Sequence, residues 1–218
     1  MQLDFTPKTM SILFAALLVA ASAFAQSRKE KPLQLEDIAD FPDTGKFPVG
    51  VVYGPKAAFK IRAPEDWVVD NRAGVKQGLP CVLYPGDSTW AEADAVMYAK
   101  IANTDTTDRD AFVKAAIDRF KKGNDKFRHE RVAEGKTEGG HAYIINDYWH
   151  GERPDAPNSQ CERVAYIQLP GAVAFIVFTV GSEELHKKHA GRVQDVVKSF
   201  TYEPKFINYK AEKPKGKK

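Results

Sequence analysis

The carboxyl-terminal third of the chain carries the strongest hydrophobic pattern. Residues 163–169 and 173–180 are apolar runs separated by a Pro-Gly pair, which predicts two antiparallel strands joined by a tight turn. In the second run both sets of alternating positions are apolar, so neither face of this strand suits water. Such a strand lies in the middle of a sheet that is covered on both faces. Residues 182–200 then have the apolar spacing of one amphipathic helix, with Ser182 as its N-cap.

The residues before this region predict shorter strands and one more helix. The helix is expected at 107–121, where apolar side chains form one continuous stripe and Thr107 with Asp110 resembles a capping box. Apolar or alternating runs predict strands at 51–53, 57–61, 81–84, 95–102, 126–133 and 141–150. Hairpin-linked strands with two helices predict an α+β fold, with one antiparallel β-sheet sandwiched by α-helices. We expect this single domain to span residues 47–204.

The amino-terminal residues have the pattern of a cleavable signal peptide at 1–25. A lysine precedes an apolar run that ends in Ala23-Phe24-Ala25, a small-x-small sequence suited to cleavage after Ala25. The run is shorter than the roughly 20 residues that span a bilayer, and no later segment reaches that length. The sequence therefore predicts a periplasmic or secreted protein without a transmembrane segment. The charged residues 26–46 are expected to form a flexible amino-terminal arm.

The formal net charge of +3 is concentrated at the carboxyl end of the chain. Six lysines and one glutamate follow Pro204, so the rest of the chain is slightly acidic. This distribution argues against nucleic-acid binding, which normally uses basic charge on the folded surface. The lysine-rich tail at 205–218 is expected to be solvated. Alternatively, the stretch from Lys210 to Lys218 makes electrostatic contact with an anionic surface.

The two cysteines, Cys81 and Cys161, leave two interpretations open. In an oxidising compartment an even number of cysteines can pair, which makes a Cys81–Cys161 disulfide possible. The alternative is two buried free thiols. A catalytic thiol is disfavoured, because no local signature places a histidine or asparagine to activate either residue.

Two groups of residues could supply catalytic or metal-ligating side chains. His141, Asp147 and His150 lie on one predicted strand with Glu152 beyond it, but strand alternation places His150 on the opposite face from the other two.

On the last predicted helix, His186 and His189 are three residues apart, with Glu183 one turn before them. The helical pattern places His189 in the apolar stripe and His186 at its edge. Both are expected to pack between helix and sheet rather than bind zinc or copper.

Aromatic residues are numerous and admit two uses. They could line an apolar cleft, but a sheet between helices normally buries them in its core. The set comprises Trp67, Tyr84, Trp90, Tyr98, Tyr143, Tyr148 and Trp149. Hydrolase, zinc-protease, phosphate-loop and dinucleotide motifs are absent from the sequence.

A strand of the form Phe-x-Ile-x-x-Pro, followed by an acidic turn and a tryptophan, occupies residues 59–67. With the closing Val-Val-Lys-Ser-Phe at 196–200, it resembles the PsbP-like superfamily over about residues 51–202. This group includes a photosystem II subunit, a Ran-binding import factor and many exported bacterial proteins. The resemblance implies an antiparallel sheet between helices and a non-catalytic, partner-binding role. It implies no site residues, because none of the family's manganese, calcium or Ran-contacting positions is matched.

These observations favour an exported, non-catalytic binding or accessory protein of unknown ligand, with an unknown protein or cell-envelope partner. They lead to no catalytic, cofactor-binding or metal residue and no cofactor. The alternative is a metal-dependent hydrolase that uses the segment from His141 to Glu152.

Overall fold

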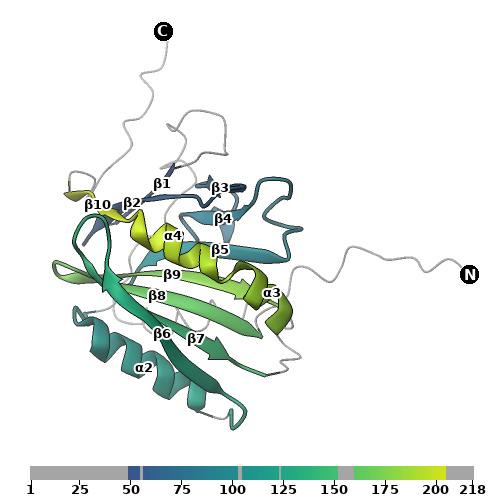
Figure 1. The fold of residues 1–218 in the computed structure, drawn as a ribbon. Helices are drawn as coiled ribbons and strands as arrows, with labels where there is room; N and C mark the ends of the chain where they lie inside the picture. Colours follow the sequence, from purple (N-terminus) through teal and green to yellow (C-terminus); the bar gives the residue numbers. More distant parts are fainter. Residues whose placement is uncertain (1–48, 55, 103–104, 123, 152–159, 205–218) are drawn as a thin grey trace, which may run out of the picture.

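A seven-stranded antiparallel sheet forms the centre of the protein (Figure 1). The computed structural model describes residues 49–54, 56–102, 105–122, 124–151 and 160–204. The strand order is β3 (Trp67–Asp70), β4 (Val82–Pro85), β5 (Ala95–Ile101), β9 (Ala172–Val180), β8 (Cys161–Leu169), β7 (Ala142–Trp149) and β6 (Arg128–Lys136). The α+β class, the antiparallel sheet and the hairpins β6–β7 and β8–β9 are confirmed.

Strand β9 is the fourth of the seven strands, as its sequence predicts. On one face Ala174, Ile176 and Phe178 have no exposed surface. On the other face Val173 and Val177 are also buried. Burying a branched or aromatic side chain stabilises a fold by about 1.5–3 kcal/mol, so this strand contributes to cores on both sides of the sheet.

The carboxyl-terminal helical region covers one of these faces, and it is interrupted. The sequence predicts a single helix at 182–200, whereas the structure has α3 (Glu183–His189) and α4 (Gly191–Lys198). Ala190 ends α3 by donating its N–H to the carbonyl of His186, and Gly191, a poor helix former, follows it. Beyond the break, α4 buries three valines completely: Val193, Val196 and Val197.

A second, three-stranded sheet lies in the same layer as α3 and α4, a feature that the sequence did not predict. Its order is β1 (Val49–Tyr53), β2 (Ala58–Arg62) and β10 (Thr201–Tyr202). Phe59 of β2 stacks on Phe200 with ring centroids 4.6 Å apart, and both belong to the core that α4 covers. The short strands carry too few residues for their alternation to show which sheet they join. The single sheet expected from sequence is therefore two sheets.

Helix α2 (Arg109–Lys121) covers the opposite face of the large sheet (Figure 1). Its N-cap is Asp108, whose carboxylate accepts from the Ala111 N–H at 2.7 Å, so the expected cap at Thr107 is wrong by one residue. Aspartate is among the strongest N-cap residues, which explains why the helix begins there. A 3-10 turn, η3 (Val75–Gln77), completes the helical elements of the described residues.

The expected leader at 1–25, the arm at 26–46 and the tail at 205–218 lie outside the described residues, as does Glu152. In the part of the chain that is described, none of the helices combines the length and apolar character needed to cross a bilayer.

Strand β6 forms one edge of the large sheet, and eight of its nine residues are exposed. Its register shifts between Arg131 and Ala133, so Val132 forms a bulge. Charged side chains and bulges are the usual means by which an edge strand avoids pairing with another chain. The strand carries both, because Arg128, Glu130, Arg131, Glu134 and Lys136 are charged.

The sheet register separates the two cysteines. Cys81 immediately precedes β4, and its carbonyl accepts from Ala99 of β5, while Cys161 lies on β8. The two residues are three strand spacings apart, about 14 Å across the sheet, and the register also offsets them along the strands. A disulfide requires Cα atoms within about 7 Å. Both cysteines are free and buried, so the structure has the second of the two alternatives and not the Cys81–Cys161 disulfide.

We expect the native protein to contain two unreactive thiols. Burial raises the pKa of Cys161 to about 11 and that of Cys81 above its ordinary range, so little reactive thiolate exists near neutral pH. A thiol-specific chromogenic reagent should detect almost none in the folded protein and two per chain in denaturant. Cys161→Ala should lower the second value to one. If the protein is denatured without a reducing agent and no thiol reacts, the two cysteines form a disulfide, which would contradict their separation in the sheet.

We also expect the charges of β6 to keep the protein from associating through this edge. Replacing Glu130 and Glu134 by threonine should promote strand pairing between chains, which light scattering coupled to size exclusion would detect as a concentration-dependent rise in mass. The matched control is the exposed ion pair of α2, Lys114 and Asp118, replaced by the same residue type. If both double variants associate equally, the charges of β6 have no special role in preventing association through this edge.

Candidate functional site

The segment that begins at His141 does not assemble one site. His141 precedes β7, and its ring lies 6.0 Å from that of Phe200 and 5.5 Å from that of Tyr202. Asp147 faces α3, whereas His150 is on the side of α2. The alternation expected from sequence is therefore confirmed. Among the described residues no group of three or more His, Cys, Asp or Glu side chains could hold a metal.

On the α3 side, Asp147 is held by an arginine from the neighbouring strand. Arg163 donates from Nε to Oδ1 at 2.6 Å and from Nη2 to Oδ2 at 2.7 Å, a bidentate pair across β7 and β8. His186 Nε2 lies 3.5 Å from Oδ1 of the same carboxylate. Burial acts to raise the pKa of Asp147, but the hydrogen bonds and positive charge of Arg163, with His186, outweigh it and hold this pKa below its usual value.

The two histidines of α3 have the reverse of their expected positions. His186 is buried and packs near the rings of Trp149 and Phe178, whereas His189 is only partly buried, with its ring 6.0 Å from that of Trp67. A single helical wheel drawn over 182–200 assumes one continuous axis. The interruption at Ala190 changes the phase between α3 and the valines of α4, and this explains the error.

On the α2 side, His150 pairs with Glu162, a residue that sequence reasoning missed. His150 Nε2 lies 3.0 Å from Glu162 Oε2, and each side chain is 2% exposed. The imidazole is enclosed by aromatic rings, with centroids at 4.9 Å for Phe120 and 5.5 Å for Phe127. Ionisable groups are rarely buried this deeply unless they are paired.

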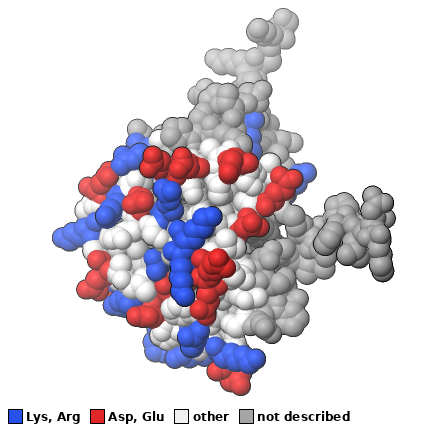
Figure 2. All heavy atoms as spheres, turned by 45° about the vertical axis from the view of Figure 1, so that its right-hand side comes forward, with Lys and Arg blue, Asp and Glu red and all other residues white. Residues whose placement is uncertain are grey.

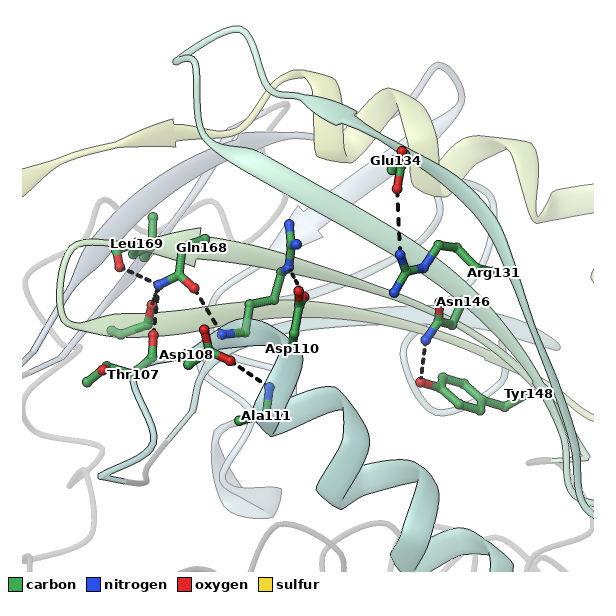
Figure 3. A network of polar contacts seen from close by, with 12 residues as sticks. Thr107, Asp108, Asp110, Ala111, Arg131, Glu134, Asn146, Tyr148, Gln168 and Leu169 are labelled. Atoms are coloured by element: carbon green, nitrogen blue, oxygen red, sulfur yellow. Dashed lines mark hydrogen bonds and ion pairs between the residues drawn. The ribbon is translucent and has the colours of Figure 1, made fainter.

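Further hydroxyl and amide groups lie on the same face of the sheet as this buried pair. Asn146 Nδ2 donates to the Tyr148 hydroxyl at 3.0 Å (Figure 3). The Tyr148 and Tyr166 hydroxyls are 3.0 Å apart. Burial, as the largest cause, raises the pKa of Tyr148 and raises those of Tyr98 and Tyr166 still further, so all three remain neutral phenols. We call this set the α2 polar cluster: Tyr98, Asn146, Tyr148, His150, Glu162 and Tyr166.

Helix α2 is fixed over the cluster at both ends. At its start the Gln168 side chain accepts from the Arg109 N–H at 2.9 Å and donates to the Thr107 carbonyl at 2.7 Å (Figure 3). Just beyond its end, Asn124 Nδ2 donates to the His150 carbonyl at 3.2 Å. One helix end is thus tied to β8 and the other to the residue that follows β7.

The remaining candidates from sequence serve in packing. Six of the seven aromatic residues considered for a cleft are buried, and Trp149 is partly buried beside Arg128, whose guanidinium lies 5.2 Å from its ring centroid. Neither cysteine has the lowered pKa that a nucleophilic thiol requires. On the face shown in Figure 2, Lys and Arg side chains are interspersed with Asp and Glu.

A weak signal for the missed residues does exist in the sequence. Glu162 and Tyr166 share one face of β8, while Asn146, Tyr148 and His150 share one face of β7. An acid within an otherwise apolar strand suggests either exposure or a buried partner. Only the strand order shows that β7 and β8 are neighbours under a helix.

Comparison with known proteins yields a likeness of fold. No protein-family model matches the chain, and no curated protein matches it. Among solved structures, it is similar to the solution structure of cyanobacterial PsbP (CyanoP) from Synechocystis sp. PCC 6803. The identity is 16%, the match covers 74% of this chain and 95% of that chain, and the TM-score is 0.42.

Asp147→Asn should lower the free energy of unfolding by about 3 kcal/mol at pH 7, because it leaves the Arg163 guanidinium without its counter-charge in a mostly buried site. Since the folded pKa of Asp147 lies below the unfolded value of about 3.9, its contribution is present above that pH. The contribution decreases as pH falls toward the folded pKa. Denaturant titrations at several pH values should therefore show the difference from wild type narrowing below pH ~4.

The control for this prediction is Asp118→Asn, which removes the exposed partner of Lys114 and should leave stability nearly unchanged. A difference between wild type and Asp147→Asn that grows on acidification would show that the pKa of Asp147 is raised and not lowered.

Proposed function

We propose that the protein is an exported, non-catalytic binding or accessory protein that acts in the periplasm or outside the cell. One observation carries the non-catalytic part. Asp147, His150 and Glu162 are each paired in the interior, on opposite faces of one sheet. Asp147 has both oxygens bonded to Arg163, and the His150–Glu162 pair is almost completely buried.

A general acid or base must come within hydrogen-bond reach of the proton that it transfers, directly or through one water. Asp147 and His150 meet neither each other nor the surface, and the pair at His150 is enclosed by Phe120 and Phe127. The alternative of a metal-dependent hydrolase requires convergence of His141, Asp147 and His150, and the two sides of β7 keep Asp147 and His150 apart. The geometry therefore supports a function performed by surfaces.

Export is proposed from the leader at 1–25, with the mature chain beginning at Gln26. The lysines between Lys210 and Lys218 supply the means for contact with an anionic partner or envelope surface. On the face in view (Figure 2) basic and acidic side chains are mixed, a charge pattern that does not favour nucleic acid as a partner of that face.

The test uses mature protein, residues 26–218, as bait in the exported fraction. We expect retention of a specific protein or envelope component, and a version shortened to residues 26–204 shows whether the lysine tail is needed.

In parallel, elemental analysis and a panel of ester, phosphoester and peptide substrates should show no stoichiometric metal and no turnover. Hydrolysis that is lost in His150→Gln would instead establish the enzyme alternative. Retention that is unchanged in the shortened protein would dismiss a role for the tail.

A further inference from the structure

Helix α2 covers a different kind of surface from the one that α4 covers. Under α4 the sheet presents apolar side chains, and the three valines of α4 are completely buried against them. Under α2 the core includes the tyrosines of the α2 polar cluster, with Asn146, His150 and Glu162 on the same face. An amphipathic helix needs no polar groups beneath it for packing, so these residues call for another explanation.

Two oxygens of the cluster lack a hydrogen-bond partner. Glu162 Oε1 and Asn146 Oδ1 are buried, in side chains belonging to residues that are 1% and 3% exposed, and neither finds a donor among the residues that the structure describes. A buried acceptor without a donor costs about 1–3 kcal/mol, and more when it is charged. Rotating the Asn146 amide would let Oδ1 accept from the Tyr148 hydroxyl, but Nδ2 would then take the buried place of Oδ1 and need an acceptor of its own.

The tyrosine pair leaves one donor available. The Tyr148 and Tyr166 hydroxyls share one hydrogen bond, which uses one of their two hydrogens. If Tyr148 is the donor, the hydroxyl hydrogen of Tyr166 is not used in this bond. If Tyr166 is the donor, the hydroxyl hydrogen of Tyr148 is not used. Asn146, Glu162 and this tyrosine pair together offer two acceptors and one hydroxyl hydrogen, which complement a molecule that has two donors and at least one acceptor.

The two acceptors belong to diagonal neighbours across β7 and β8. Asn146 is opposite Val164, and Glu162 is two residues from Val164 on the same face. Diagonal neighbours of this kind are separated by about 7–8 Å between backbone positions, a span over which a small molecule or a short chain of waters can act.

We infer that the α2 polar cluster is a binding site for a small, neutral hydrogen-bond donor, of which water is the smallest member. The guest is neutral because Glu162 already faces His150 at 3.0 Å and attracts the positive charge of Arg119. A further buried charge would lack compensation. The guest is small because Phe120, Phe127 and Val113 enclose the face. The inference does not depend on export or on the proposed partner binding.

The direct test is an experimental high-resolution structure of the wild-type protein, with and without formamide as a slightly larger probe. We expect an ordered water, or formamide in its place, within hydrogen-bond distance of both Glu162 Oε1 and Asn146 Oδ1. Either occupant supports the site and shows the size that it admits. A structure in which these oxygens bond directly to protein donors, with no ordered molecule between them, overturns it.

Solution measurements provide the second arm. Magnetic relaxation dispersion of water oxygen-17 should detect long-lived internal water in the wild type, and Asn146→Leu should lose at least one molecule per chain. Tyr143→Phe, on the opposite face of β7, is the matched control and should lose none at this site. Wild-type protein without long-lived water and without a formamide-dependent shift of the Asn146 side-chain resonances would also contradict the inference, whether or not the variants fold.

Discussion

The alternation of side chains along β7 and β8 is the constraint on which the chemistry of this protein depends. Each strand sends successive residues to opposite faces, and both faces are covered. Asp147 and Arg163 therefore go to the α3 side as a bonded pair, while His150 and Glu162 go to the α2 side as another. Residues that are close along the chain are thus kept apart by the thickness of the sheet.

The two faces reached in this way have different roles. The side covered by α3 and α4 holds the larger hydrophobic core, which includes residues of the small sheet and the stacked pair of Phe59 and Phe200. The α2 side combines aromatic rings with buried hydroxyl, amide and carboxylate groups. Polar networks of this kind stabilise a fold when every member has a partner, and each buried member without a partner is costly and requires an explanation.

The sequence predicted the elements whose patterns are long. The hairpin β8–β9, the central place of β9 and the amphipathic helix α2 all follow from hydrophobic patterns that extend over seven or more residues. It did not predict the small sheet, because β10 has two residues and its pairing with β2 joins distant parts of the chain. The break at Ala190 was missed because the apolar spacing continues across it, although a following glycine weakens a helix.

The site was less predictable than the fold. The separation of Asp147 from His150 follows from alternation alone, as does the exclusion of one shared metal centre. The pairing of His150 with Glu162 required the strand order and the register of Tyr148 opposite Glu162, neither of which is local in sequence. The question of a disulfide also depended on the strand order. Two cysteines at the starts of strands can pair only if the strands are adjacent, and β5 and β9 lie between Cys81 and the strand of Cys161.

The fastening of α2 at both ends has a kinetic consequence. The Gln168 amide connects its first residue to the sheet, and the Asn124 amide connects the residues after it to the His150 carbonyl. For whatever occupies the interior beneath this helix, a route out past α2 requires one of these ties and the packing of Val113 and Phe120 to open together. Exchange with bulk solvent is then governed by local unfolding of a helix, a process far slower than the diffusion of a small molecule.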